Sequence, residues 1–420
     1  MSDTKILKAA LLLAAIPFVL MAQNTNSPYS RNGFGILENP ALGNSKGMGG
    51  ASIGIRENNM INPANPASYS AIDTMTMLWD FGVSGNYSRF KEASVHQGNP
   101  NGGLDYVAMK IPLKRWWGVA IGLTPFSKVG YAYSHSYTLT NKYTYTDSYS
   151  GTGGLNTLFL GTAVALGKSF GIGVNYKYIF GTITQSSVAS SSDDESFNSR
   201  ATSENWYMHG STLELGLQYA ATLDKKNKLV LGATFSEKMP LNTNVYTLTM
   251  STDTTDTSVA SDFGLPRTIG LGVSWIYDNR LTLALDYQHQ NWADVKFHGA
   301  KDSLSNSSRI SFGAEYLPAM FTSHYYQAIK YRFGGYYSDS YIKNFEYYSD
   351  LTSANKIGNI RNVGLTFGIG LPLRGQRSEM NLSFEAGKLL LPSASMIHEN
   401  YYKLSLGITF NETWFFKRKL

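Results

Sequence analysis

Short stretches in which large apolar residues alternate with small or polar residues recur from about Thr74 to the end of the chain. In Phe170–Gly181, one parity carries Phe, Ile, Val, Tyr, Tyr and Phe, whereas the other carries mainly Gly, Asn and Lys. This period places the two sets of side chains on opposite faces of a β-strand. The pattern therefore predicts an all-β protein.

Two architectures fit this alternation: a soluble sandwich and a barrel that spans a membrane. The polar parity is rich in Gly, Ala and Ser, and charged residues make up only 16% of the chain. A confined lumen explains this composition better than a solvated sheet face does. Aromatic residues gather at the ends of the apolar parity, as they do at membrane interfaces. We therefore expect a transmembrane β-barrel.

The alternating stretches are separated by turns and number fourteen, an even count as expected for a bacterial barrel. We expect a 14-stranded antiparallel transmembrane β-barrel over residues 74–420, preceded by a separate segment. The expected strands lie near 74–90, 102–114, 116–138, 141–167, 169–187, 200–222, 227–250, 259–277, 280–298, 306–317, 326–342, 357–372, 377–389 and 400–417. Tight turns such as Lys114-Arg115 and Asp278-Asn279 suit the periplasmic side, and the long polar stretch 188–199 suits the outside.

The first 22 residues read as a secretory signal peptide. Lys5 and Lys8 precede the apolar run Ala9–Leu20, and Ala22 offers a small residue for cleavage. A membrane anchor is the alternative, but a spanning helix needs about 20 apolar residues. An exported chain whose strands face lipid belongs in the outer membrane of a Gram-negative bacterium.

Residues 23–73 have no strand or helix period and are rich in Gly, Pro and Asn. Two triplets close this segment: Asn62-Pro63-Ala64 and Asn65-Pro66-Ala67. Each proline fixes its own backbone angle and restricts the asparagine before it. A compact, irregular segment next to the first strand is expected to fill or cap the barrel as a hatch, or plug.

These features together resemble the FadL/TodX family of outer-membrane transport proteins. The resemblance rests on the export signal, the Gly49-Gly50-Ala51-Ser52 start, the Asn65-Pro66-Ala67 triplet and the strand count, and it covers nearly the whole mature chain. It implies a plugged 14-stranded barrel that passes hydrophobic molecules such as long-chain fatty acids. The triplet is doubled here and is followed by Ser-Tyr, and the chain does not end on an aromatic residue. Some related barrels serve protein secretion instead of transport.

Four cations are expected to point into the lumen: Lys177, Lys330, Arg332 and Lys403. Carboxylates of the same parity, including Glu214, Asp286, Glu315 and Glu385, also point inward. The cations and carboxylates then pair and brace the lumen, or some of the cations receive an anionic head group of a ligand. Both readings remain open from the sequence.

Pro125 follows an alternating stretch that contains Gly122. Proline cannot donate to a sheet ladder and is confined to edges, strand starts and bulges. Since a closed barrel has no edge, Gly122 and Pro125 are expected to mark a bulge or a lateral opening in the wall. In the family that the chain resembles, the third strand carries an inward kink of this kind. The alternative places Pro125 above the membrane.

The sequence favours a non-enzymatic protein without cofactor or metal. Gly50-Ala51-Ser52-Ile53-Gly54 matches the nucleophile-elbow pattern but lacks the strand before it and the helix after it. The seven histidines are dispersed, cysteine is absent, and no basic patch suits nucleic acid. We expect passive uptake of hydrophobic small molecules through a barrel in contact with outer-membrane lipid. The alternatives are a non-transporting barrel that works with protein-secretion or surface-assembly machinery, and a barrel esterase or phospholipase.

Overall fold

A computed structural model gives the architecture of most of the chain. The predicted signal peptide, residues 1–22, lies outside the described residues. In the described part, no helix has the length and apolar character needed to cross a membrane. The structure describes residues 27–92, 94–138, 143–194, 197–251, 254–260, 262–300, 304–319, 324–342, 359–373, 378–393 and 396–413.

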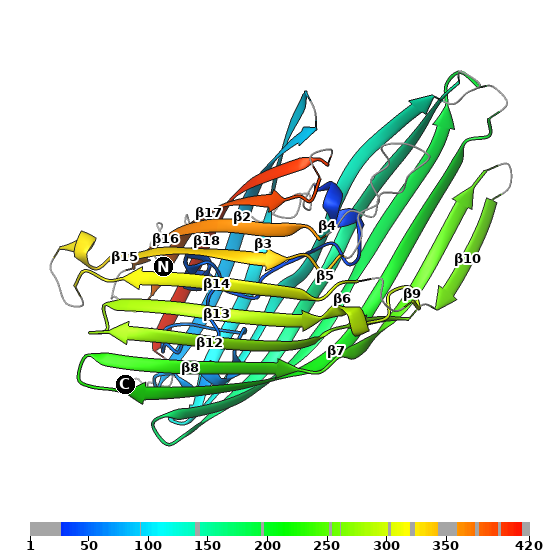
Figure 1. Cartoon of the computed structure of the whole chain (residues 1–420). Helices are drawn as coiled ribbons and strands as arrows, with labels where there is room; N and C mark the ends of the chain where they lie inside the picture. The colour runs from blue at the N-terminus through cyan, green and yellow to red at the C-terminus, as the bar shows by residue number, and fades with distance from the viewer. Residues whose placement is uncertain are drawn as a thin grey trace, which may run out of the picture.

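Long β-strands dominate the part of the chain that the structure describes, with five short 3-10 helices between or before them (Figure 1). The strands are β1 (Ile36–Leu37), β2 (Thr76–Glu92), β3 (Val95–Lys114), β4 (Trp117–Thr138), β5 (Thr144–Leu166), β6 (Phe170–Ser191), β7 (Arg200–Thr222), β8 (Asn227–Ser236), β9 (Met239–Met250), β10 (Thr254–Ala260), β11 (Phe263–Leu265), β12 (Arg267–Tyr277), β13 (Leu281–Asn291), β14 (Ser307–Tyr316), β15 (Lys330–Asp339), β16 (Arg361–Pro372), β17 (Glu379–Leu390) and β18 (His398–Thr413). The helices are η1 (Pro28–Arg31), η2 (Gly43–Met48), η3 (Pro66–Ser70), η4 (Trp292–Asp294) and η5 (Tyr325–Gln327).

The strands from β2 onward form one antiparallel sheet, and β18 pairs with β2 to close it. β8 and β9 are successive parts of one strand, and β10, β11 and β12 are parts of the next. Pro266 separates β11 from β12, because proline has no N–H to donate to the ladder. Counted in this way, the described residues form a closed barrel of 14 strands, which confirms the predicted fold class.

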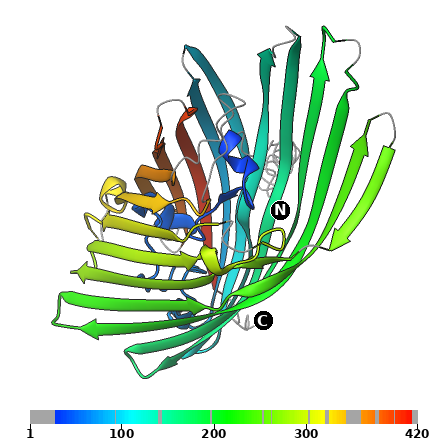
Figure 2. The same cartoon turned by 45° about the vertical axis from the view of Figure 1, so that its right-hand side comes forward.

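The two sides of the barrel differ in height (Figures 1 and 2). Strands β3 to β7 contain 20–23 residues each, and with β9 they form what we call the tall wall. Strands β12 to β17 contain 10–12 residues each and form the low wall. At about 3.3 Å per residue, ten additional residues lengthen a strand by roughly 33 Å. The tall wall therefore rises well beyond the low wall on the side away from the tight turns.

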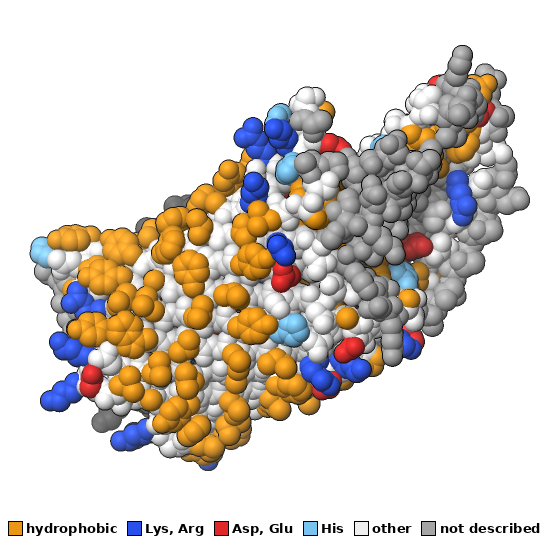
Figure 3. Space-filling view, in the orientation of Figure 1, with side chains coloured by type: hydrophobic (Ala, Val, Ile, Leu, Met, Phe, Trp, Pro, Cys, Tyr) orange, Lys and Arg blue, Asp and Glu red, His pale blue; other side chains and the backbone are white. Residues whose placement is uncertain are grey.

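The predicted lipid face is on the outside of the barrel. Leu215 and Leu271 are each 54% exposed and Leu285 is 51% exposed, whereas Val174 and Leu406 point the same way but are half-buried. Figure 3 shows hydrophobic side chains spread over the outer face of the low wall, with Lys and Arg at the end that carries the tight turns. This distribution matches an apolar band between two polar rims.

Residues 27–73, which we call the plug segment, lie inside the barrel in direct contact with its inner glycines. A Cβ on Gly232 would lie 2.1 Å from the carbonyl oxygen of Ile53, and one on Gly118 would lie 2.1 Å from that of Tyr69. Real Cβ atoms essentially never come this close to another atom, so only glycine lets the two backbones touch. The small inward residues that the sequence shows therefore make room for the plug segment.

Candidate functional site: plug, cavity and split wall

The two Asn-Pro-Ala triplets join the plug segment to itself and to the barrel. The Asn62 side chain donates to the carbonyl oxygen of Ser52 at 2.7 Å, and the Asn65 side chain donates to those of Ile53 at 2.9 Å and Leu217 at 3.1 Å. Asn65 also caps η3, which begins at Pro66, by accepting from the Ala67 N–H. Both asparagines are almost fully buried. The asparagines of the triplets thus hold the plug segment together and bind it to the barrel wall.

The Pro63 and Ala64 positions serve the same purpose as the asparagines. The Pro63 carbonyl oxygen accepts from the Asn175 side chain on β6 at 3.1 Å, and the Ala64 N–H donates to the Asn62 side chain at 3.2 Å. Pro66 packs against the inner glycines of the wall: a Cβ on Gly173 would lie 2.4 Å from its carbonyl carbon. These contacts explain why a doubled triplet suits this position.

Asp286 on β13 holds the backbone of the plug segment at Ser52 and Ile53. One of its carboxylate oxygens accepts from the backbone N–H of Ser52 at 2.5 Å and from that of Ile53 at 2.7 Å. The Ser52 hydroxyl donates to the carbonyl oxygen of Gly50 at 3.2 Å. The Gly50–Gly54 stretch contains neither strand nor helix, so it lacks the setting that a nucleophile elbow requires.

Two of the four candidate ligand cations, Lys177 and Lys403, each contact a carboxylate. Lys177 lies 2.6 Å from Glu214, two positions along the facing strand. Lys403 lies 3.2 Å from Glu38 of the plug segment, and Lys128 on β4 lies 3.2 Å from the other oxygen of Glu38. Glu38 therefore bridges β4 and β18. Sequence reasoning missed Glu38 because the plug segment has no period from which its direction could be inferred.

Lys330 and Arg332 form a second ionic cluster. Arg332 lies 2.6 Å from both Glu315 and Glu379, and its side chain is fully buried. Lys330 lies 3.1 Å from Glu379 and 3.8 Å from Glu315. All four candidate ligand cations are thus paired with carboxylates, which is the bracing arrangement that the sequence left open.

The two lysines that contact Glu38 change the pKa of its carboxyl group. Burial alone would raise the pKa of the Glu38 carboxyl, but Lys128 and Lys403 outweigh it and lower that pKa to about 2. A carboxylate between two ammonium groups is favoured in its charged form. The bridge therefore stays ionised throughout the physiological range.

The wall splits between β3 and β4 close to Pro125. The β3–β4 ladder ends at the pair Val107 and Leu123, although both strands continue beyond it. The register of β4 against β5 shifts between Pro125 and Ser127, which is a β-bulge. Gly122 lies below the split, where a Cβ would meet the Phe159 ring at 2.7 Å.

Part of the plug segment covers the free edge of β4 just above the split. Ile36 and Leu37 of β1 pair with Lys128 and Ser127, and the Glu38 N–H donates to the Phe126 carbonyl oxygen at 3.0 Å. This edge is therefore closed by a short strand from inside the barrel. The Asn65-Pro66-Ala67 turn lies elsewhere, against β6 and β7.

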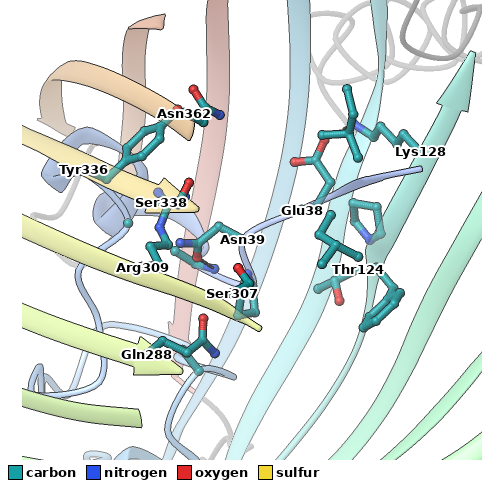
Figure 4. A pocket seen from close by; sticks show the side chains of 18 of the residues that line it. Glu38, Asn39, Thr124, Lys128, Gln288, Ser307, Arg309, Tyr336, Ser338 and Asn362 are labelled. Carbon is teal, nitrogen blue, oxygen red and sulfur yellow. Dashed lines mark hydrogen bonds and ion pairs between the residues drawn. The ribbon is translucent and has the colours of Figure 1, made fainter. Parts of the chain in front are cut away.

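A cavity of about 600 Å³ adjoins the plug segment, between the low wall and the β4 bulge. Its low-wall side carries Gln288, Ser307, Arg309, Ser338 and Asn362, and the facing side carries Glu38, Thr124 and Lys128 (Figure 4). Polar and charged groups thus occupy both sides. No group of three or more potential metal ligands occurs among the described residues.

An aromatic cluster links the plug segment to both walls. Phe34 of the plug segment is fully buried and packs 5.9 Å from Trp292 and 6.0 Å from Phe263, measured between ring centres. Trp206 on the tall wall joins the same cluster, 5.7 Å from Phe263. The first residues of the plug segment are therefore held by both walls.

Comparison with known proteins identifies the family. The sequence model of BamG matches residues 4–420. The chain belongs to the BamG family. A search of curated proteins finds no match.

Several solved outer-membrane barrels share the fold of this BamG-family chain. The toluene transporter TodX of Pseudomonas putida is 13% identical, with a TM-score of 0.59, over 90% of this chain and 100% of its own. A FadL homologue of Pseudomonas aeruginosa is 10% identical, with a TM-score of 0.58, over 89% and 99%. The toluene transporter TbuX of Ralstonia pickettii is 12% identical, with a TM-score of 0.56, over 90% and 99%.

These likenesses establish the fold. The resemblance to FadL/TodX proteins therefore holds for architecture, whereas the sequence family is a distinct one, BamG. Identities of 10–13% carry no information on cargo.

Proposed function

We propose that this chain is a non-transporting barrel that serves the BAM assembly machinery of the outer membrane as a structural subunit. The family name supports this assignment over uptake of hydrophobic molecules. The observation that carries it is the firmly bound plug segment, because its backbone packs on the inner glycines of the wall and its polar groups bond to the strands.

The energetic cost of removing the plug segment supports the proposal. Opening a path along it would break the two bonds to Asp286 and the bridge from Glu38 to Lys128 and Lys403. Separating a buried ion pair costs about 3–5 kcal/mol when one partner is lost. Passive uptake driven by a small hydrophobic ligand offers little to offset such a cost.

The cavity also fits a non-transporting barrel better than a hydrophobic channel. Sites for apolar ligands are lined mostly by hydrophobic side chains, with a few placed polar groups. Here Lys128, Glu38, Arg309 and Glu385 are among the lining residues. An apolar molecule there would meet these charged groups as well as hydrophobic side chains such as Ile36 and Phe126, so only part of its surface would gain an apolar environment.

The tall wall supplies a surface for assembly partners. It rises roughly 30 Å farther along the strand direction than the low wall, and it carries paired hydroxyl side chains such as Ser134 with Ser148 and Ser136 with Thr146. A sheet face of this kind, joined to a rigid barrel, suits protein contacts outside the membrane.

The decisive experiment depletes the protein in cells and measures two outputs together. The proposal expects reduced amounts of other outer-membrane barrels and co-purification of the tagged chain with the BAM machinery, whereas uptake of long-chain fatty acids and toluene stays normal. Normal barrel levels with impaired uptake would reverse the assignment.

Uptake of hydrophobic small molecules such as long-chain fatty acids is the second candidate function, and the split wall favours it. The cavity includes Thr124 and Pro125 among its lining residues, so it adjoins the split between β3 and β4. Under this candidate, cargo would leave sideways into outer-membrane lipid near Gly122 and Pro125. Pro125→Val should then reduce uptake without unfolding the barrel. If the chain instead has the structural role, cells with this variant should assemble other outer-membrane barrels normally.

A further inference from the structure

Four polar side chains of the low wall form a continuous row across the cavity. Gln288 pairs in register with Arg309, Arg309 with Ser338, and Ser338 with Asn362. Adjacent strands lie about 4.8 Å apart, so the row spans roughly 15 Å. Figure 4 shows these residues on the same side of the cavity. The row repeats a polar group at a spacing close to the length of one pyranose unit.

The row retains unused hydrogen-bonding capacity. Gln288 and Ser338 have no side-chain hydrogen bond to other described residues, and the Asn362 side chain is bonded only through its oxygen, which accepts from the Tyr401 hydroxyl at 3.0 Å. The lumen cations described above are, in contrast, all paired. These side chains are thus ready to bond hydroxyl groups of a ligand.

Arg309 differs from the paired cations of the lumen. Among the described residues, no carboxylate lies within 4.0 Å of its guanidinium group. The guanidinium stacks over the Tyr336 ring at 3.8 Å and donates to the Gly49 carbonyl oxygen at 3.2 Å and to the Ser311 hydroxyl at 3.1 Å. Arginine presents five donors in a fixed fork that matches carboxylate and phosphate groups. The centre of the row therefore favours an anionic substituent.

The opposite side of the cavity offers an aromatic surface. The register of β4 passes from Pro125 to Ser127, so Phe126 is the additional residue of the bulge. Bulges redirect side chains, and Phe126 is among the lining residues of the cavity. A sugar ring presents apolar C–H groups on its faces and hydroxyls at its edge, which suits a polar row opposite a phenyl ring.

We propose that this cavity binds a short oligosaccharide that carries an anionic group. Arg309 holds the carboxylate or phosphate, Gln288, Ser338 and Asn362 bond the hydroxyls of successive sugars, and Phe126 contacts a ring face. The cavity volume of about 600 Å³ lies within the usual range of ligand sites, ~300–1,000 Å³. The proposal is independent of the role in assembly.

Calorimetry on the full chain in detergent tests the site with two matched probes. Trigalacturonate carries the carboxylates, and galactotriose is its neutral counterpart. We expect trigalacturonate to bind about tenfold or more tightly than galactotriose, because a hydrogen bond to a charged group contributes more than a neutral one. Arg309→Gln should remove this preference and leave galactotriose binding unchanged. Phe126→Ala should weaken both sugars.

Arg267→Gln is the matched control. Arg267 is not among the residues that line the cavity and lies 2.9 Å from Glu237 in an exposed ion pair, so this change should leave both affinities unaltered. If Arg309→Gln disturbs folding through its bond to Gly49, Asn362→Leu tests the same row without touching the plug segment, and it should weaken both sugars. Absence of saturable binding, equal affinity for both probes, or displacement of trigalacturonate by equimolar inorganic phosphate would overturn the proposal.

Discussion

Replacing Asp286 with alanine should release the part of the plug segment that it holds. The carboxylate accepts from the N–H groups of Ser52 and Ile53, at 2.5 and 2.7 Å, in a buried setting. Removing a partner leaves a buried polar group unsatisfied, at a cost of about 1–3 kcal/mol for each group. Two such groups give ~2–6 kcal/mol in total.

This cost converts into a measurable increase in local opening. Every 1.4 kcal/mol changes an equilibrium about tenfold, so even the lower bound raises the open population of the stretch around Ser52 roughly 30-fold. Hydrogen–deuterium exchange of a peptide covering residues 49–61 should speed up by this factor in Asp286→Ala. Peptides from the outer strands should keep their exchange rates.

Two further variants make the experiment specific. Asp286→Asn keeps an oxygen that can accept both bonds and loses only the charge, so its exchange rate should lie between those of the native protein and Asp286→Ala. Glu237→Ala, in an exposed bridge to Arg267, should change nothing in the plug segment. If Asp286→Ala exchanges at the native rate, the carboxylate does not hold the plug segment and the argument for a fixed plug fails.

Three other predictions follow from packing and charge. Leu271→Arg on the lipid face should cost about 2–4 kcal/mol in bilayer refolding, whereas Leu271→Phe should be tolerated; equal refolding would contradict the facing of β12. Gly232→Ala should displace the plug backbone at Ile53 and lower the melting temperature, whereas Gly85→Ala, whose nearest neighbouring atom lies 3.7 Å away, should not. Glu38→Gln should destabilise the barrel above pH 4.5 by a constant amount. The deficit should shrink as the pH falls below 4.5, the ordinary pKa of this carboxyl, and vanish below about 2, where native Glu38 also becomes neutral.

Much of the barrel could be predicted because alternation reports directly on the face of a strand. Leu271 and Leu285 face outward and Glu214 and Arg332 face inward, as their parity requires. Tight turns such as Asp278-Asn279 can also be predicted from the sequence, and both residues adopt positive φ there. Each of these features is local to a few residues.

Pairing between strands could not be predicted in the same way. Arg332 and Glu315 are direct register partners, but alternation alone does not fix the offset between two strands. The same limit applies to the row from Gln288 to Asn362, whose members come from four strands. Glu38 and β1 escaped notice because they belong to the aperiodic plug segment, where position is set by contacts with distant strands.

Because the two walls differ in height, the molecule presents different surfaces to its neighbours in different directions within the plane of the membrane. A barrel with an even rim presents the same outline to neighbours on every side, so turning it about the membrane normal changes little. Here a neighbouring protein beside β12 to β17 lies next to the low wall, with the cavity behind it. A neighbouring protein beside β4 to β7 lies next to the tall wall. Any complex that includes this chain must therefore fix its rotation as well as its position.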